Sequence, residues 1–409
     1  MILTDRSIVA LAASSIFALA VLGCSSSDAP AQPAPDAEAP PSTPVEAGAA
    51  IPQVDASVPD VRDAGSPFGE PIVIPPADLE KWVWVPIEGS RCADNTIAGV
   101  GVNFTSQSRE LLVYFQGNGV CYDGLTCNLF KNLLVGMGDD PLDHMWWGVK
   151  NAGETGIFDR KAEANPFRKS NYVVFPHCTI DGHTADKESE YSGVGVVHQH
   201  GYRNVTEALK RIVPTFADAS RIVLTGYSAG GIGVTVNYHQ MATAFAAVGQ
   251  PPPFLVNDAG PIMRKPYLED GAQKKLLEGW GLDKTVGTFC PKCISEGMHN
   301  IYEANATLHP GVRSSQLCAY EDSTVTMLYR LLNGDANIFD NDRLKKGLLD
   351  HAEWLAGGQV ALAPSVHRSF FYKGDDHGTL FGTFYAKPDL LSFLNDQLSG
   401  SPTWPSYTP

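Results

Sequence analysis

Residues 221–231 read Arg-Ile-Val-Leu-Thr-Gly-Tyr-Ser-Ala-Gly-Gly. The apolar, β-branched run at 221–225 is typical of a buried parallel strand, and residues 232–241 favour a helix. Between them, Gly226 and Gly230 flank Ser228 in a Gly-x-Ser-x-Gly pattern. After a strand and before a helix, this pattern predicts a nucleophile elbow, because glycines permit a turn too tight for larger residues. We therefore expect Ser228 to present its hydroxyl at the top of a sheet.

A histidine must complete such a site, because a serine hydroxyl is a weak nucleophile until a base takes its proton. His377 has the best context, since 368–373 read as a strand, 374–378 as the loop at its carboxyl end and 388–398 as a closing helix. Catalytic groups gather at the carboxyl ends of strands in such sheets. His367 lies at the opposite end of the same strand, which argues against it. The remaining histidines well after the serine are His299, His309 and His351.

Two aspartates compete to orient that histidine. Asp322 follows a candidate strand at 315–320 and precedes a helix that begins near Ser323, whereas Asp258 ends the strand-like run 254–257. In this fold class the acid lies between the serine and the histidine in the chain. Asp322 is preferred, because the interval to the histidine leaves room for one helix and one strand. Either aspartate could instead cap a helix.

Ester chemistry also needs donors for the negative charge that develops on the carbonyl oxygen. The strand-like run 110–115 leads into the loop Gln116-Gly117-Asn118-Gly119-Val120-Cys121, whose backbone N–H groups could face that charge. One more N–H comes from Ala229, the residue after the serine.

The cysteines predict disulfides rather than a metal site. Lipidation of Cys24 would leave seven of the eight cysteines, so that one stays free or pairs with another molecule. Cys290 and Cys293, followed by His299, lack a second ligand pair for zinc. We expect one of these two cysteines to pair with Cys318.

No metal or organic cofactor is expected. His198 and His200, separated by Gln199, have no neighbouring carboxylate pattern in the sequence that would support a metal site.

The N-terminal region predicts export and tethering. Residues 7–23 are the only long apolar run and are too short to cross a bilayer, so residues 1–23 read as a signal peptide. Val-Leu-Gly-Cys at 21–24 has the form of a bacterial lipobox that would lipidate Cys24, although an ordinary secretory signal is the alternative. Residues 24–70 are rich in Ala, Pro, Ser and Asp and predict a disordered linker. Residues 71–409 would form the folded domain, anchored to the outer membrane or cell surface.

Overall charge excludes one class of partner. The chain has 409 residues and a formal net charge of −15 at pH 7. A surplus of negative charge gives no attraction to a phosphate backbone, so nucleic acid is not an expected partner.

Several segments together resemble the pectin acetylesterase and Notum family of carboxylesterases over roughly residues 81–398. The segments are Cys92-Ala93-Asp94-Asn95, the loop 117–121 with Cys127 after it, the run 176–183, the elbow at Ser228, Glu321-Asp322-Ser323 and Asp376-His377-Gly378. The resemblance implies an α/β-hydrolase fold, with a central, mostly parallel sheet, helices on both faces and stabilising disulfides. It implies the triad Ser228, Asp322 and His377, and oxyanion donors at Gly119, Val120 and Ala229. It also implies the disulfides Cys92–Cys178 and Cys121–Cys127.

Two departures from the family pattern bear on the substrate. The family's Gly-Gly-Gly-Trp loop is here Gly-Asn-Gly-Val at 117–120, and the region 290–318 has no clear family match and is a candidate lid or pocket wall. We expect a monomeric, tethered serine carboxylesterase that removes acyl groups, foremost O-acetyl groups on a polysaccharide. The alternatives are an esterase of longer acyl groups on protein or lipid, an amidase or peptidase with the same triad, and a catalytically silent carbohydrate-binding lipoprotein of the same fold.

Overall fold

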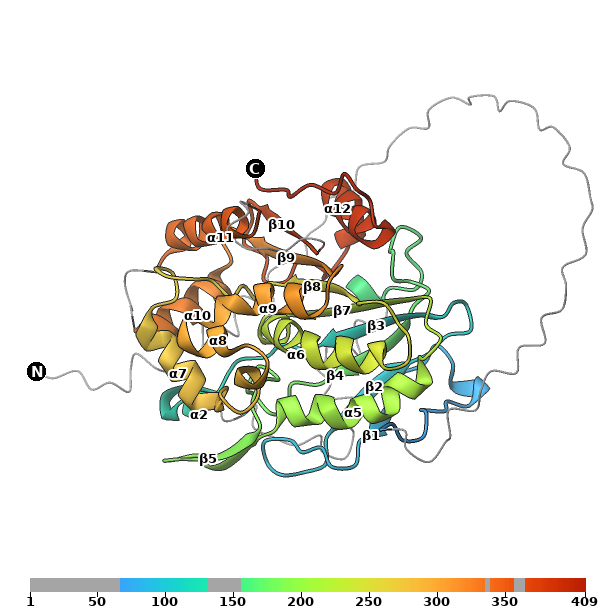
Figure 1. The fold of residues 1–409 in the computed structure, drawn as a ribbon, viewed down its shortest axis with the longest axis horizontal. Helices are drawn as coiled ribbons and strands as arrows, with labels where there is room; N and C mark the ends of the chain where they lie inside the picture. The colour runs from blue at the N-terminus through green and yellow to red at the C-terminus, as the bar shows by residue number, and fades with distance from the viewer. Residues whose placement is uncertain (1–66, 131, 133–155, 335–338, 357–364) are drawn as a thin grey trace, which may run out of the picture. The chain divides into compact units, whose positions relative to one another are not determined.

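A central sheet organises the computed structural model, which describes residues 67–130, 132, 156–334, 339–356 and 365–409. Within these residues the sheet has eight strands, in the order β1-β2-β4-β3-β7-β8-β9-β10 (Figure 1). The pairs β1–β2 and β2–β4 are antiparallel, and every other neighbouring pair is parallel. The strands are β1 (Val83–Pro86), β2 (Gly99–Asn103), β3 (Glu110–Phe115), β4 (Asn171–Phe175), β7 (Arg221–Tyr227), β8 (Phe254–Asp258), β9 (Arg313–Ala319) and β10 (Val366–Tyr372). The expected mostly parallel sheet is confirmed.

Both faces of the sheet are buried, as the apolar composition of its strands predicts. In β3, Leu111, Val113 and Phe115 belong to a core with α5 (Gly201–Thr215) and α6 (Ala229–Ala246). Leu112 and Tyr114 point to the other face, where they share a core with α12 (Pro388–Ser399). Side chains alternate along a strand, so one apolar run supplies both cores. The expected helices on both faces are therefore confirmed.

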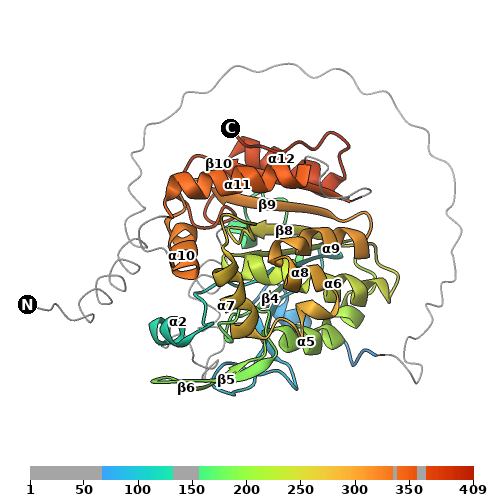
Figure 2. The same cartoon turned by 60° about the vertical axis from the view of Figure 1, so that its left-hand side comes forward.

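A third core lies at one end of the strands, where α7 (Asp270–Trp280) and α10 (Ser323–Asn333) are side by side (Figures 1 and 2). It includes residues from the region 290–318 for which the sequence predicts a lid or pocket wall. The remaining helices are α2 (Gly124–Leu129), α7 (Asp270–Trp280), α8 (Pro291–Ser295), α9 (Ile301–Leu308), α10 (Ser323–Asn333) and α11 (Asn341–Ala356). Short 3-10 turns are η1 (Pro76–Asp78), η3 (Gly156–Phe158), η4 (Val286–Thr288), η5 (Met298–Asn300) and η6 (Phe384–Ala386).

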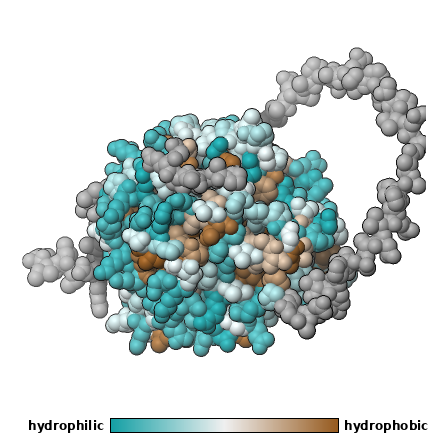
Figure 3. Space-filling view, viewed as in Figure 1, coloured by the Kyte–Doolittle hydropathy of each residue, from teal (hydrophilic) through white to brown (hydrophobic). Residues whose placement is uncertain are grey.

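The predicted signal peptide, Cys24 and the linker up to residue 66 lie outside the described residues. From Pro67 to Pro409 the chain forms one unit. None of the helices described here has the length and apolar character needed to cross a bilayer. The face in Figure 3 is largely hydrophilic. Large exposed apolar side chains are Val73, Ile97, Leu125, Val196 and Leu308.

Three disulfides join the described cysteines. Cys92–Cys178 and Cys121–Cys127 are the pairs that the family resemblance implies. The third bond joins Cys290 to Cys293, so the expected bond to Cys318 is wrong. The first turn of α8 brings the Cα atoms of Cys290 and Cys293 to 5.3 Å, within the span of a disulfide. Cys318 instead lies fully buried on β9.

Cys318 should be the only thiol in residues 67–409 that alkylates after denaturation without a reductant. In the folded protein it should resist alkylation, because burial both blocks access and raises the pKa of its thiol well above the usual value. Peptide mass mapping after labelling with and without denaturant measures this. A reduced sample, in which all seven cysteines label, is the control. Labelling of Cys290 or Cys293 in the unreduced sample would contradict the assignment.

Candidate active site

The predicted site residues meet at the carboxyl edge of the sheet. Ser228 directly follows β7, Asp322 follows β9 after two further residues, and His377 lies in the loop after β10. Parallel strands place the loops after them at the same edge, which is where ligands bind in open α/β sheets. The structure therefore brings together three side chains that are far apart in the sequence.

The turn at Ser228 is a strained elbow. Its φ of 56° and ψ of −125° lie in a region that residues with side chains rarely adopt. A Cβ on Gly226 would meet the carbonyl of Gly230, and a Cβ on Gly230 would meet the carbonyl of Phe115. The Ser228 N–H donates to the carbonyl of Asp258 at 2.8 Å, which ties the turn to β8. The two glycines are thus required by close backbone approach.

His377 is held by Asp322. The Nδ1 atom of His377 lies 2.9 Å from Oδ2 and 3.1 Å from Oδ1 of Asp322. Asp322 is 0% exposed, whereas the His377 side chain is 23% exposed and can reach a ligand. The Oδ1 atom of Asp322 also accepts from the N–H groups of Thr324 and Val325 at the start of α10. The helix-cap role and the histidine contact, which the sequence presents as alternatives, therefore occur in the same carboxylate.

Ser228 and His377 line one cavity. It encloses about 250 Å³, part of it open to solvent. Its other lining residues are Ile232, Ala259, Gly260, Pro261, Thr324, Val325, Leu328 and Tyr329. The Tyr227 ring packs beside the imidazole, with 5.6 Å between ring centroids. The Ser228 side chain and the His377 imidazole thus share a small, mainly apolar chamber, and the buried Asp322 contacts the imidazole from outside its lining.

Asp258 has a different partner. Its two carboxylate oxygens accept from the N–H of Thr379 at 2.7 and 2.8 Å, and one also accepts from the N–H of Leu380 at 2.9 Å. Burial raises the pKa of the Asp258 carboxyl from 3.8 to about 6, while these N–H groups act in the opposite direction. Asp258 therefore anchors the loop that carries His377, and Asp322 is the carboxylate that contacts the imidazole.

Because of the Asp258 carboxyl, the free energy of unfolding should fall as the pH rises from about 4 to about 6. In this window the folded state retains a proton that the unfolded chain has released, so stability falls with rising pH, by up to about 3 kcal/mol for a shift of about two pKa units. Denaturant unfolding of wild type and Asp258→Asn at several pH values measures the difference. Other carboxyls contribute equally to both proteins, so parallel pH profiles would contradict this role.

The other candidate histidines lie elsewhere. His367 is buried at the start of β10, where its Nδ1 lies 2.9 Å from Ser314 Oγ. His351 packs against it, with 5.9 Å between ring centroids. His299 packs on Trp354, and His309 contacts His239. None of these four lines the cavity with Ser228.

The loop 116–121 runs directly against the elbow. A Cβ on Gly117 would meet the carbonyl of Tyr227 and lie 2.9 Å from the Cβ of Ser228. The described residues offer no hydrogen-bond partner to the N–H groups of Gly119 and Val120. Ala229 is the first residue of α6, and the first N–H of a helix has no partner within the helix. Within the described part of the chain, the N–H groups of Gly119, Val120 and Ala229 thus have no hydrogen-bond partner, and they lie on the two segments that adjoin at Ser228.

Side chains for which the sequence predicts no role bind the carbonyls of this loop. His183 Nε2 lies 2.8 Å from the carbonyl of Gln116, and His177 Nδ1 lies 3.0 Å from that of Asn118. The carbonyl of Cys121 accepts from Trp280 Nε1 at 2.8 Å and from Gln199 Nε2 at 2.6 Å. These contacts bind three of the six carbonyls of the loop and restrain its conformation.

His177 and His183 are neutral at pH 7. His177 Nε2 accepts the N–H of Gly182 at 2.8 Å, so its proton is on Nδ1, facing the Asn118 carbonyl. Burial lowers the pKa of His183 to about 4 and, with His183 nearby, that of His177 well below the usual value. Their place in the run 176–183, after a strand of the same sheet, was the available sequence signal.

A second apolar cavity adjoins the first. The two share Ile232, Pro261, Leu328 and Tyr329 as walls, and the second encloses about 460 Å³, part of it open to solvent. Leu268, Leu276, Trp280, Leu282, Met298 and Leu332 complete most of its lining. Met298, which belongs to the region without a clear family match, thus forms part of a pocket wall.

Comparison with known proteins agrees with this geometry. Residues 84–261 match the family described as Pectinacetylesterase, a segment that contains the loop 116–121 and the elbow and ends before Asp322. Palmitoleoyl-protein carboxylesterase notum2 of Xenopus laevis is 28% identical over 157 residues, which are 37% of this chain and 30% of the relative. Palmitoleoyl-protein carboxylesterase NOTUM of Homo sapiens is 24% identical over 166 residues, 39% of this chain and 31% of the relative. The chain thus matches about a third of these relatives' length. The family resemblance read from the sequence is confirmed.

Proposed function

We propose that this chain, whose residues 84–261 match the pectinacetylesterase family, is a serine carboxylesterase that uses Ser228, His377 and Asp322. One observation carries the proposal. His377 is bound to the buried Asp322 and lines the same cavity as Ser228, which stands on a strained elbow. A strained serine beside an oriented imidazole is the arrangement that activates a hydroxyl for acyl transfer.

The reaction would proceed through an acyl-enzyme. Ser228 Oγ attacks the ester carbonyl carbon while His377 Nε2 takes the hydroxyl proton, and Asp322 stabilises the resulting imidazolium through Nδ1. The oxyanion accepts from the N–H groups of Gly119, Val120 and Ala229. The C–O bond to the alcohol then breaks, and the alcohol leaves with the proton from His377. Water, deprotonated by His377, cleaves the acyl-serine bond, and the acid leaves with Ser228 restored.

O-acetyl groups on a polysaccharide are the proposed substrate. The chamber at Ser228 is small and mainly apolar, which suits a short acyl group, and the predicted export would give access to polymers outside the cell. The adjoining apolar cavity supports a second candidate, an ester with a longer acyl chain that extends past Leu328. Lipid attachment at Cys24 would hold either enzyme at a membrane surface.

Labelling with a fluorophosphonate probe tests the serine mechanism. Wild type should label at a peptide that contains Ser228, and Ser228→Ala should not label. Equal labelling of both proteins, or none where a known serine hydrolase labels, would refute the proposal. Binding of acetylated polymer without acetate release would indicate the silent carbohydrate-binding lipoprotein, and equal rates on matched ester and amide substrates would indicate an amidase.

A series of matched esters from acetyl to octanoyl tests the acyl group. Leu276→Phe should fill the second cavity only, so it should reduce hydrolysis of the longer esters and spare the acetyl ester. Leu277→Phe, at the neighbouring position outside both linings, is the matched control. If Leu276→Phe leaves the chain-length profile unchanged, the second cavity does not hold the acyl chain.

A further inference from the structure

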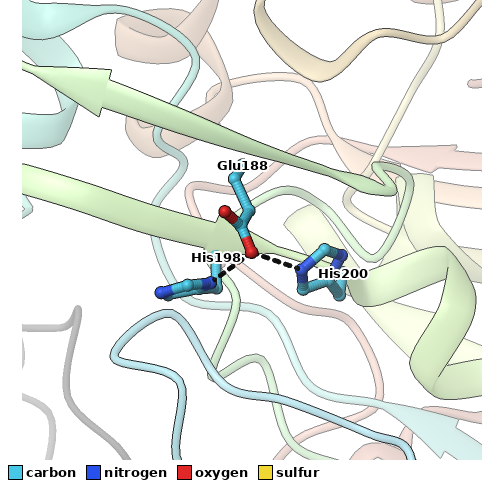
Figure 4. A group of neighbouring side chains, drawn as sticks. All are labelled: Glu188, His198 and His200. Atoms are coloured by element: carbon cyan, nitrogen blue, oxygen red, sulfur yellow. Dashed lines mark hydrogen bonds and ion pairs between the residues drawn. The ribbon is translucent and has the colours of Figure 1, made fainter.

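The hairpin of β5 (Lys187–Tyr191) and β6 (Gly195–Gln199) gathers three potential metal ligands. Glu188 is the cross-strand partner of His198 in the antiparallel pair. His200 follows two residues later, and alternation along the extended chain turns it to the same face. The carboxylate of Glu188 consequently lies between the two imidazole rings (Figure 4).

The separations of these ligand atoms suit one ion. Glu188 Oε1 lies 3.0 Å from His198 Nδ1 and 3.9 Å from His200 Nε2, and all three ligand atoms lie within 4.8 Å of one another. Two ligands on a tetrahedral Zn²⁺, each about 2.0–2.1 Å from the metal, are about 3.4 Å apart. Small rotations of the side chains would therefore place all three atoms around a common centre.

A second carboxylate orients one of the imidazoles. Asp186 Oδ1 lies 2.7 Å from His200 Nδ1, so the Nδ1–H of that ring can donate to Asp186 while Nε2 faces Glu188. Arg203 pairs with the same oxygen of Asp186 at 2.9 Å, which fixes the carboxylate. Metal-binding histidines commonly donate their second nitrogen to a carboxylate in this way, because it sets the tautomer.

We propose that Glu188, His198 and His200 bind a divalent ion of the zinc class, with water at the fourth position. Two imidazoles and one carboxylate suit Zn²⁺ and its neighbours, whereas Ca²⁺ and Mg²⁺ prefer sites made only of oxygen. The Glu188 side chain is 60% exposed and His200 is 7% exposed, so the site opens to solvent on one side and is supported on the other. From the sequence, this histidine pair is a poor candidate for a metal site because no neighbouring carboxylate pattern supports it, and the hairpin brings Glu188 beside it.

The ion would join two elements. Glu188 and His198 lie on the hairpin, while His200 is the residue immediately before α5, which packs on the central sheet. The start of α5 is itself held in place, because the N–H of Gly201 donates to one carboxylate oxygen of Asp181, and the other oxygen accepts the N–H of His183. An ion at this place would attach the hairpin to the start of α5 and raise the stability of the folded state by mass action.

Titration of the chelator-treated full chain with Zn²⁺ tests the proposal. Wild type should bind one more Zn²⁺ than the His198→Ala/His200→Ala variant by calorimetry, and Zn²⁺ should raise the unfolding temperature of wild type but not of this double variant. Glu188→Gln should weaken binding at this site more than tenfold, and this exposed side chain can change without loss of the fold. Asp186→Asn should weaken it by about 10- to 100-fold, since the imidazole loses its orienting partner.

Glu190→Gln provides the matched control, because Glu190 lies on the same strand two residues from Glu188 and outside the ligand group. It should bind Zn²⁺ like wild type. Equal stoichiometry in wild type and the double histidine variant would overturn the proposal. So would unchanged affinity in Glu188→Gln. Labelling of Ser228 by a fluorophosphonate is independent of these results, so the ion site and the esterase proposal fail separately.

Discussion

Ser228→Ala should lower kcat/KM for an ester substrate by about 10⁴- to 10⁶-fold. The variant retains the donors of the loop 116–121 but has no atom that can form the acyl-enzyme. Alanine can occupy the elbow about as well as serine, because both carry a Cβ at the same positive φ. Steady-state kinetics on an aryl acetate, with circular dichroism to verify folding, measures the loss.

Thr324→Ala is the matched control for the removal of a hydroxyl. Thr324 lines the same cavity as Ser228 but has no role in the proposed reaction, so its loss should change kcat/KM less than about tenfold. Activity of Ser228→Ala within tenfold of wild type would show that another group is the nucleophile.

Asp322→Asn should lower kcat by about 10⁴-fold, the scale seen when the orienting aspartate of a serine protease is amidated. An amide can present its NH₂ group to His377 Nδ1, which then accepts a hydrogen bond and places the proton on Nε2, the atom that must act as base. The amide oxygen can still accept from the N–H groups of Thr324 and Val325, so α10 keeps its cap. Activity should fall much more than stability.

Asp258→Asn provides the comparison for this prediction. Asp258 is equally buried, but it binds the backbone of Thr379 and Leu380 and not the imidazole. Its amidation should therefore reduce kcat less than about 100-fold and alter the pH dependence of stability instead. A larger loss of kcat in Asp258→Asn than in Asp322→Asn would reverse the assignment of the two aspartates.

The elbow and its strands were predictable because they depend on neighbours in the chain. A β-branched run, two glycines around a serine and a continuation that favours a helix specify a strand, a tight turn and a helix by local sterics. The helix begins at Ala229, immediately after the serine, earlier than the run 232–241 indicates. The strand before His377 and the helix after it follow the same logic and lie where the sequence places them.

The sequence favoured Asp322 over Asp258 only by its interval to the histidine, because both aspartates follow strands and either could cap a helix. Both aspartates lie next to the loop that carries His377. Only the folded structure shows that Asp322 contacts the imidazole of His377, whereas Asp258 accepts from the backbone N–H of Thr379 in that loop. The pairing of Cys290 with Cys293 was missed for a related reason. It depends on the turn at the start of α8, whereas the spacing to Cys318 says nothing about which way each sulfur points.

Local pattern was enough to predict the serine elbow with its strand and helix and the histidine of the final loop, because steric rules and hydrophobic alternation act over a few residues, whereas the α/β-hydrolase sheet was implied by the family resemblance. Strand order, cross-strand register and packing determined the contacts between residues that are far apart in the chain. Because of them, His177 and His183 contact the carbonyls of a loop about 60 residues earlier in the chain, and Glu188 lies beside His198. Contacts of this kind form only when the whole chain folds. Strand pairing and burial against the sheet then determine which residues are in contact, and their separation along the chain does not.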